Sequence, residues 1–231
     1  MTMRQHTSQE YEAELEAVRQ KIFAMGRQVD HLLQMSGKAL EQNDAELCKR
    51  ILADDRNTDS MELDIDHLCL EILARRQPVA GDLRLLTSAL KLVIDLERVG
   101  DMGVSIASRV LELGPEPPLV PYDDLQRMLI TAREMLTEAL GALETQDSER
   151  AIRAINKDEV VDAYYAQIFN NVLSRMRESP DNIHRATRVQ AISKYIERIG
   201  DHATNIAERV IFILTSEDIR HTSRVHRSEL S

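Results

Sequence analysis

Residues 97–110 read ERVGDMGVSIASRV, and residues 197–210 read ERIGDHATNIAERV. Eight of the fourteen positions are identical at a spacing of one hundred residues. Two shorter matches occur in the same order at a spacing of 103 residues: 41–44 with 144–147, and 55–59 with 158–162. Three matches in one order indicate that the chain contains two copies of a unit of about 100 residues.

A proline-rich stretch separates the two copies. Residues 114–121, GPEPPLVP, contain four of the six prolines of the chain. Because proline lacks a backbone donor and clashes with the preceding helical turn, no helix is expected to cross this stretch. We therefore predict a first unit at 8–113, a linker at 114–121, a second unit at 122–214 and a C-terminal tail at 215–231.

Each unit shows three helical patterns of apolar residues. The predicted helices cover 8–41, 44–76 and 79–113 in the first unit, and 122–145, 147–178 and 181–214 in the second. Asn43 and Glu46 have the spacing of a capping box, and Ser179 is placed to cap a helix that begins with Pro180. Aromatic residues make up only 3% of the chain, which favours helices over sheets. The sequence predicts an all-α fold of two tandem, homologous, antiparallel three-helix bundles.

The net charge and the cysteines limit the compartment and the partners. The formal net charge is −10, which disfavours binding to nucleic acid and to anionic membranes. Residues 210–214 form an apolar run far too short to span a bilayer, and residues 1–10 lack a signal-peptide core. Cys48 and Cys69 fit no metal-binding spacing and are expected to be buried thiols. We expect a cytoplasmic protein that does not bind nucleic acid.

Carboxylates recur in pairs, four residues apart, inside the repeated motifs. The pairs are Asp55/Asp59, Glu97/Asp101, Asp158/Asp162 and Glu197/Asp201. Such pairs lie side by side on a helix, about 5–6 Å apart at Cβ, and repel each other. In the predicted helix 147–178 they interrupt the apolar stripe that continues through Phe169. A hard cation would compensate them: Mg²⁺, Mn²⁺ or iron first, with Zn²⁺ and Ca²⁺ as alternatives.

Three further residues complete the predicted acidic sites. Asn205 extends the polar row of the second unit by one turn and joins the predicted ligands. Gly100 and Gly200 lie inside the motifs, where glycine costs about 1 kcal/mol relative to alanine in a helix. We expect them to let the second and third helices of each unit approach at the acids. His202 is expected to face solvent. The chain shows no Glu-x-x-His ligand pattern, phosphate-binding loop or nucleophile motif, so no catalytic residue is predicted.

These residues resemble the PhoU family over roughly residues 10–221. The similarity is carried by the two ERxGD motifs, the two DxxxD motifs and the stretch RRQPVAGDLR at 75–84. It implies two similar three-helix bundles, metal at the acidic motifs, frequent homodimers and no classical enzymatic activity. It also implies a negative regulator of phosphate uptake and of the phosphate-starvation regulon. Such a regulator would contact the ATPase subunit of the phosphate ABC transporter and the phosphate-sensing histidine kinase, and would meet the membrane only through them.

The two units differ at their acidic sites. Ser105 stands where the second unit has Asn205, and Glu62 and Asp66 have the apolar counterparts Tyr165 and Phe169. Two alternatives to a metal-binding adaptor remain open. One is a carboxylate-bridged metalloenzyme, and the other is a helical scaffold with an acidic face and no ion. The lack of histidine ligands and of a general base favours the adaptor over the enzyme.

Overall fold

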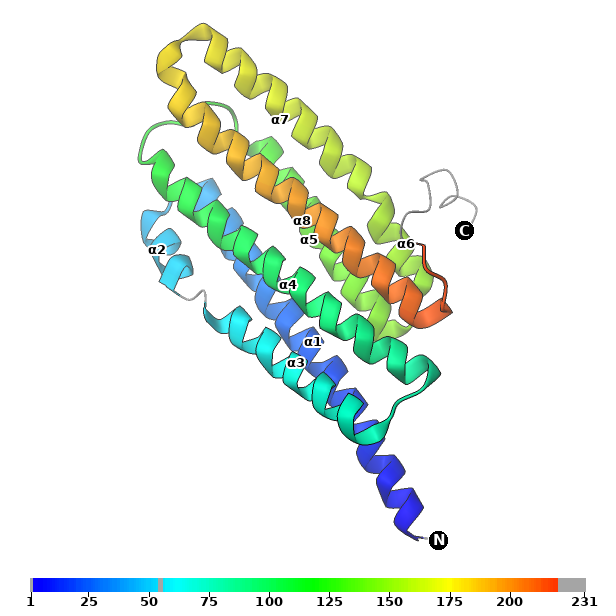
Figure 1. Ribbon diagram of the computed structural model, residues 1–231. Coiled ribbons are helices and arrows are strands. Elements are labelled where there is room, and N and C mark those ends of the chain that lie inside the picture. The colour runs from blue at the N-terminus through cyan, green and yellow to red at the C-terminus, as the bar shows by residue number, and fades with distance from the viewer. Residues whose placement is uncertain (1, 54–55, 220–231) are drawn as a thin grey trace.

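The chain folds into helices in both units. The computed structural model describes residues 2–53 and 56–219, with the side chains of 9–53 and 57–219. The helices are α1 (Thr2–Gln42), α2 (Ala45–Ala53), α3 (Arg56–Arg76), α4 (Ala80–Leu113), α5 (Asp123–Thr145), α6 (Ser148–Asn156), α7 (Asp158–Glu178), the short 3₁₀ helix η1 (Pro180–Asn182) and α8 (Ile183–Thr215). No strand occurs in these residues. The prediction of two tandem helical bundles is confirmed: α1–α4 form the first and α5–α8 the second (Figure 1).

The prediction of one continuous second helix is wrong for the second bundle. In the second bundle α6 and α7 meet at Lys157, whose N–H donates to the carbonyl of Ala154, three residues back, at 3.2 Å. Such a bond tightens the turn relative to an α-helix and changes the direction of the chain. In the first bundle α2 ends at Ala53 and α3 begins at Arg56, and residues 54–55 lie outside the described part. Helix α1 also begins earlier than predicted, at Thr2 instead of residue 8.

The buried face of α7 differs in part from the predicted apolar stripe. Its buried side chains are Val161, Ile168 and Val172. The predicted stripe shares Val172 with this face, but it ran through Asp162 and Phe169, one residue later than Val161 and Ile168, and both are exposed. Asp162 therefore lies outside the buried face of α7, whereas Asp158 is partly buried beside Gly200.

Aspartate caps the short helix that follows the first helix of each bundle. The predicted cap at Asn43 is wrong, because Asn43 ends α1 in a left-handed conformation with φ 50. Asp44 Oδ1 instead accepts from the N–H groups two and three residues later, at 3.0 and 2.9 Å. Asp147, its counterpart at a spacing of 103, accepts from the N–H three residues later. The prediction for Ser179 is confirmed, since its hydroxyl accepts from the N–H of Asp181 at the start of η1.

The core of the first bundle requires a close approach of α1 and α4. Ser36 Oγ on α1 donates to the carbonyl of Gly103 on α4 at 2.8 Å. A Cβ atom at Gly103 would lie 2.1 Å from Leu32 Cδ2, so a larger residue would push the helices apart.

The two bundles join along α4 and α8, which run antiparallel (Figure 1). Asp95 on α4 is only 6% exposed. It accepts from Arg209 Nε at 3.0 Å and is bonded to His202 Nδ1 at 2.8 Å. At the other end Arg188 Nε donates to Glu112 at 3.0 Å. The prediction that His202 faces solvent is wrong, because a helix of the other bundle covers it.

The contacts between α4 and α8 repeat with the two helices exchanged. Arg209 bonds Asp95, and Arg109, one hundred residues earlier, lies near Tyr195, one hundred residues after Asp95. The bundles are therefore related by an approximate twofold axis. Figure 1 shows a front layer of helices in the order α3, α4, α8 and α7, and α1 and α5 lie behind this layer.

The segment between the bundles also contacts α8. Arg185 Nη1 lies 2.9 Å from a carboxylate oxygen of Glu116, and its Nη2 donates to the carbonyl of Pro117. The residues 114–121 carry no helix, and they lead from the end of α4 to the start of α5.

Candidate metal centres

The first acidic cluster lies between α3 and α4. One carboxylate oxygen from each of Asp59, Glu97 and Asp101 lies within 4.8 Å of the other two. Glu97 is mostly buried and Asp101 is half exposed. Arg98 pairs with both, at 3.4 Å from Glu97 Oε2 and 3.7 Å from Asp101 Oδ2. Three carboxylate oxygens that converge on one point form a suitable ligand set for a hard cation.

Gly100 and Gly200 allow the paired helices to approach at the acids, as predicted. A Cβ atom at Gly100 would lie 3.2 Å from Thr58 Cγ2 on α3. A Cβ atom at Gly200 would lie 3.3 Å from Val161 Cγ1 and 3.5 Å from Asp158 Oδ1 on α7. These are tight contacts, so a Cβ atom at either glycine would force the facing side chain to shift slightly.

Glu62 and Asp66 belong to the first cluster, although the predicted ligands did not include them. Burial raises the pKa of Glu62, and the charges of Asp66, Asp59 and Asp101 raise it further, while Arg98 acts in the opposite direction. Asp66 Oδ1 is buried and has no hydrogen-bond partner among the described residues. In the sequence these two acids are distinctive, because the second unit has the apolar residues Tyr165 and Phe169 at the corresponding positions.

The second acidic cluster, between α7 and α8, is partly neutralised. Burial raises the pKa of Asp201, and the charges of Glu197 and Asp162 act in the same direction. Lys194 Nζ lies 2.5 Å from Glu197 Oε2 and 5.5 Å from the centre of the Tyr165 ring. A triplet of carboxylates as close as that of the first bundle does not occur among the described residues here.

The remaining predicted ligands have different positions. Asp55 lies outside the described residues. Asp158 begins α7 beside Gly200, and Asn205 is half-buried on α8, one turn after Asp201. The structure thus brings three predicted ligands together in the first bundle and places the predicted acids of the second along one seam.

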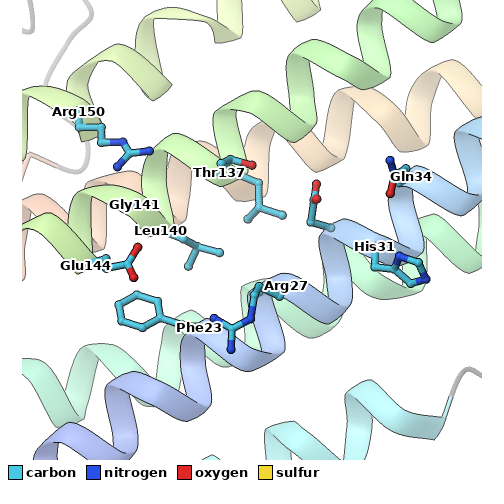
Figure 2. A pocket seen from close by; sticks show the side chains of 12 residues that line it. Phe23, Arg27, His31, Gln34, Thr137, Leu140, Gly141, Glu144 and Arg150 are labelled. Atoms are coloured by element: carbon cyan, nitrogen blue, oxygen red, sulfur yellow. The ribbon is translucent and has the colours of Figure 1, made fainter.

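A groove of about 490 Å³ lies elsewhere, between α1 and the corner of α5 and α6 (Figure 2). Phe23 and Leu140 supply apolar surface, and Arg27 contributes a cation from α1. Arg150 lines the opposite end and donates to Glu138 at 2.9 Å. Of the predicted ligands, the eight that the structure describes do not line the groove, so these carboxylates are not part of this hollow.

A family model described as the PhoU domain matches the chain twice, at residues 22–110 and 125–210. The chain belongs to the PhoU family. It is 38% identical to the phosphate-specific transport system accessory protein PhoU homolog of Pseudomonas putida, over 94% of this chain and 85% of that protein. It is 34% identical to the phosphate-specific transport system accessory protein PhoU of Escherichia coli K12, over 96% of this chain and 92% of that protein.

Solved PhoU structures share the fold. The crystal structure of PhoU from Pseudomonas aeruginosa has a TM-score of 0.85 and 37% identity, and covers 90% of this chain and 100% of its own. The phosphate transport system regulatory protein PhoU from Streptococcus pneumoniae has a TM-score of 0.84 and 28% identity, with coverage of 90% and 98%. The resemblance to the PhoU family is therefore confirmed. In the described part of this chain, none of the helices is long and apolar enough to cross a bilayer.

Replacing Glu62 with glutamine is expected to stabilise the chelator-treated protein at neutral pH. The pKa of Glu62 is raised above its ordinary value of 4.5, so ionisation favours the unfolded chain. This destabilisation is complete above the pKa of the folded state and disappears as the pH falls below the unfolded value. The melting temperature of Glu62→Gln should therefore exceed that of the wild type at neutral pH, and the difference should vanish in acid.

Thermal melts followed by circular dichroism, in chelator and across this pH range, measure the effect. Glu149→Gln is the matched control, because Glu149 is exposed on α6. It should change the melting temperature little at any pH. If the difference in melting temperature between Glu62→Gln and the wild type does not depend on pH, the raised pKa of Glu62 is not its cause.

Proposed function

We propose that the protein is an adaptor that restrains phosphate uptake and the phosphate-starvation genes when phosphate is plentiful. It would do so by contacting the ATPase subunit of the phosphate ABC transporter and the phosphate-sensing histidine kinase. The observation that carries the proposal is the match along both bundles to relatives named as accessory proteins of the phosphate-specific transport system. The adaptor would act in the cytoplasm as a homodimer, bind no nucleic acid and reach the membrane only through these partners.

Action by contact and not by catalysis is supported by the chemistry of the clusters. Their carboxylates lie along seams between helices, and the groove of Figure 2 lies on other elements. His202, which follows Asp201 in the chain, is bonded to Asp95 of the other bundle and not to the acidic cluster. We therefore favour the adaptor over a carboxylate-bridged metalloenzyme.

The acidic clusters are proposed to hold hard cations as part of this function. The proposed ligands are Asp55, Asp59, Glu97 and Asp101 in the first bundle, and Asp158, Asp162, Glu197, Asp201 and Asn205 in the second. The residues fit such an ion, because Asp66 Oδ1 has no other partner among the described residues and burial raises the pKa of Glu97. Mg²⁺, Mn²⁺ or iron suits these oxygen ligands best, with Zn²⁺ and Ca²⁺ as alternatives. A bound cation would offset the repulsion that now opposes the pairing of α3 with α4 and of α7 with α8.

Deletion of the gene in its native cells tests the function. Phosphate-starvation genes should stay active in high phosphate, and the intact chain supplied from a plasmid should switch them off. A reporter of the regulon and the uptake of labelled phosphate are the two measurements. Normal repression and normal uptake in the deletion strain, together with turnover of a small molecule by the purified protein, would overturn the proposal.

A further inference from the structure

An apolar surface lies on the first bundle without a covering element. Nine large apolar side chains are exposed in the described part of the chain, and five of them lie on the hairpin of α3 and α4. These five are Leu63, Leu70, Val79, Leu83 and Ile94. Leu90, partly buried, lies between Leu83 and Ile94 on α4. Exposed apolar residues are ordinary when scattered, but a group on one hairpin indicates an interaction site.

The helical register brings these side chains together. On α4, Leu83, Leu90 and Ile94 are spaced by seven and four residues, so they share one side of the helix. Helix α3 runs antiparallel to α4, with Thr58 beside Gly100 and the connection at residues 77–79. Leu70 is therefore level with the part of α4 near Leu90. We call the surface formed by Leu70, Leu83, Leu90 and Ile94 the apolar face.

The second bundle shows that apolar residues at two of these places are not needed for folding. Its residues one hundred positions after Leu90 and Ile94 are Gln190 and Lys194, whereas Leu83 corresponds to the exposed Ile183. Lys194 pairs with Glu197, and Gln190 donates to the Tyr165 hydroxyl at 3.1 Å. The same helix in the same fold thus accepts polar residues at these places, so packing within the bundle does not explain the apolar ones.

The apolar face ends at the first acidic cluster. Ile94 precedes Glu97 by one turn on α4, and Leu70 follows Asp66 by one turn on α3. The acids beyond this end repel one another, since they raise the pKa of Glu62. A ligand that matches both parts has an apolar ridge that ends in positive charge.

We propose that the apolar face docks an amphipathic helix of a partner protein whose apolar ridge ends in lysine or arginine. Helices of this kind bind through apolar anchors that are three, four and seven residues apart. Leu83, Leu90 and Ile94 are seven and four residues apart, so they form a row along α4 against which such anchors can pack. The inference rests on the proposed adaptor role, for which it names the surface. Leu90 and Ile94 carry no ligand oxygen, so loss of docking is separable from loss of metal.

A synthetic peptide about 18 residues long, five turns of helix, tests the docking. Leucines form its ridge and lysines lie at one end; two controls have the same residues in scrambled order or glutamate in place of lysine. Fluorescence anisotropy with the full chain at physiological salt should show the Leu/Lys peptide binding at least about tenfold more tightly than either control, because only it pairs the apolar ridge with the acids.

Matched variants locate the binding. Leu90→Gln with Ile94→Gln, which places no charge beside Glu97, should weaken binding about tenfold or more, because each lost anchor removes buried apolar surface. Ile130→Gln is the control: Ile130 is 49% exposed on α5 and Ile94 is 45% exposed. It should leave binding within about twofold. Circular dichroism and metal content should match those of the wild type in both variants.

Four outcomes would overturn the docking proposal. They are no binding of the Leu/Lys peptide, equal binding of the scrambled peptide, an equal loss with Ile130→Gln, and dissociation of a dimer by the paired variant in sedimentation. The last would assign the apolar face to a second copy of the chain. If repression in cells is lost on gene deletion while the peptide does not bind, the adaptor role stands and the surface is wrong.

Discussion

Replacing Asp95 with alanine is expected to lower the free energy of unfolding by about 3–5 kcal/mol. The carboxylate is buried between the bundles and bonds both Arg209 and His202. Its removal leaves the Arg209 guanidinium, which is mostly buried, without its acid. An unpaired buried charge costs far more than the loss of an exposed ion pair. Urea denaturation followed by circular dichroism measures the change.

Asp64→Ala is the control for Asp95→Ala. Asp64 on α3 pairs with Lys21 at 3.3 Å, but its side chain is 64% exposed. An exposed pair contributes about 0–1 kcal/mol, so this variant should unfold nearly as the wild type does. Similar losses in the two variants would show that Asp95 does not hold the bundles together.

The paired substitution Glu97→Gln with Asp101→Asn is expected to remove the cation proposed for the first bundle. Amides keep the shape of the carboxylates but not the charge that binds a hard cation. Metal analysis of protein purified without chelator should show a loss confined to the first cluster. A ligand at a hundredfold excess over its Kd stabilises the folded state by about 2.7 kcal/mol, so the rise of melting temperature with Mn²⁺ or Mg²⁺ should shrink as well.

Glu197→Gln with Asp201→Asn is the matched variant in the second bundle. This variant should lose less metal than the double variant of the first bundle, because Lys194 already pairs with Glu197. Monovalent salt at matched ionic strength controls for screening. Unchanged metal content in both double variants would show that these carboxylates are not ligands.

The repeats made the fold predictable from the sequence. The motifs at 97–110 and 197–210 define two units, and proline at 114–121 separates them, so two helical bundles follow without any contact information. The turn at Lys157 was not predictable, because it arises from one hydrogen bond three residues back within a continuous apolar pattern. Beyond that point the predicted stripe holds at Val172, which is buried, but not at Phe169, which is exposed.

The paired carboxylates of the acidic sites could be predicted from the sequence, but their surroundings could not. Pairs four residues apart identify Asp59, Glu97 and Asp101, since local spacing decides what lies on one side of a helix. The surroundings of a residue depend on the other elements of the fold. The hydrogen bond between His202 and Asp95 joins two bundles, so the sequence did not indicate it. The burial of Asp66 Oδ1 depends on the packing of α3 against α4, which the sequence did not give either.

The proline-rich connection changes the affinity that the α4–α8 contact requires. Two domains joined by a short linker meet at an effective concentration in the millimolar range. An association of only about 4 kcal/mol, a Kd near 1 mM, then suffices to begin closing the molecule. Separate halves would have to find each other in dilute solution, and obligate dimers usually do so through large apolar interfaces. Covalent duplication can therefore tolerate charged contacts such as Glu112 with Arg188 where the two bundles meet.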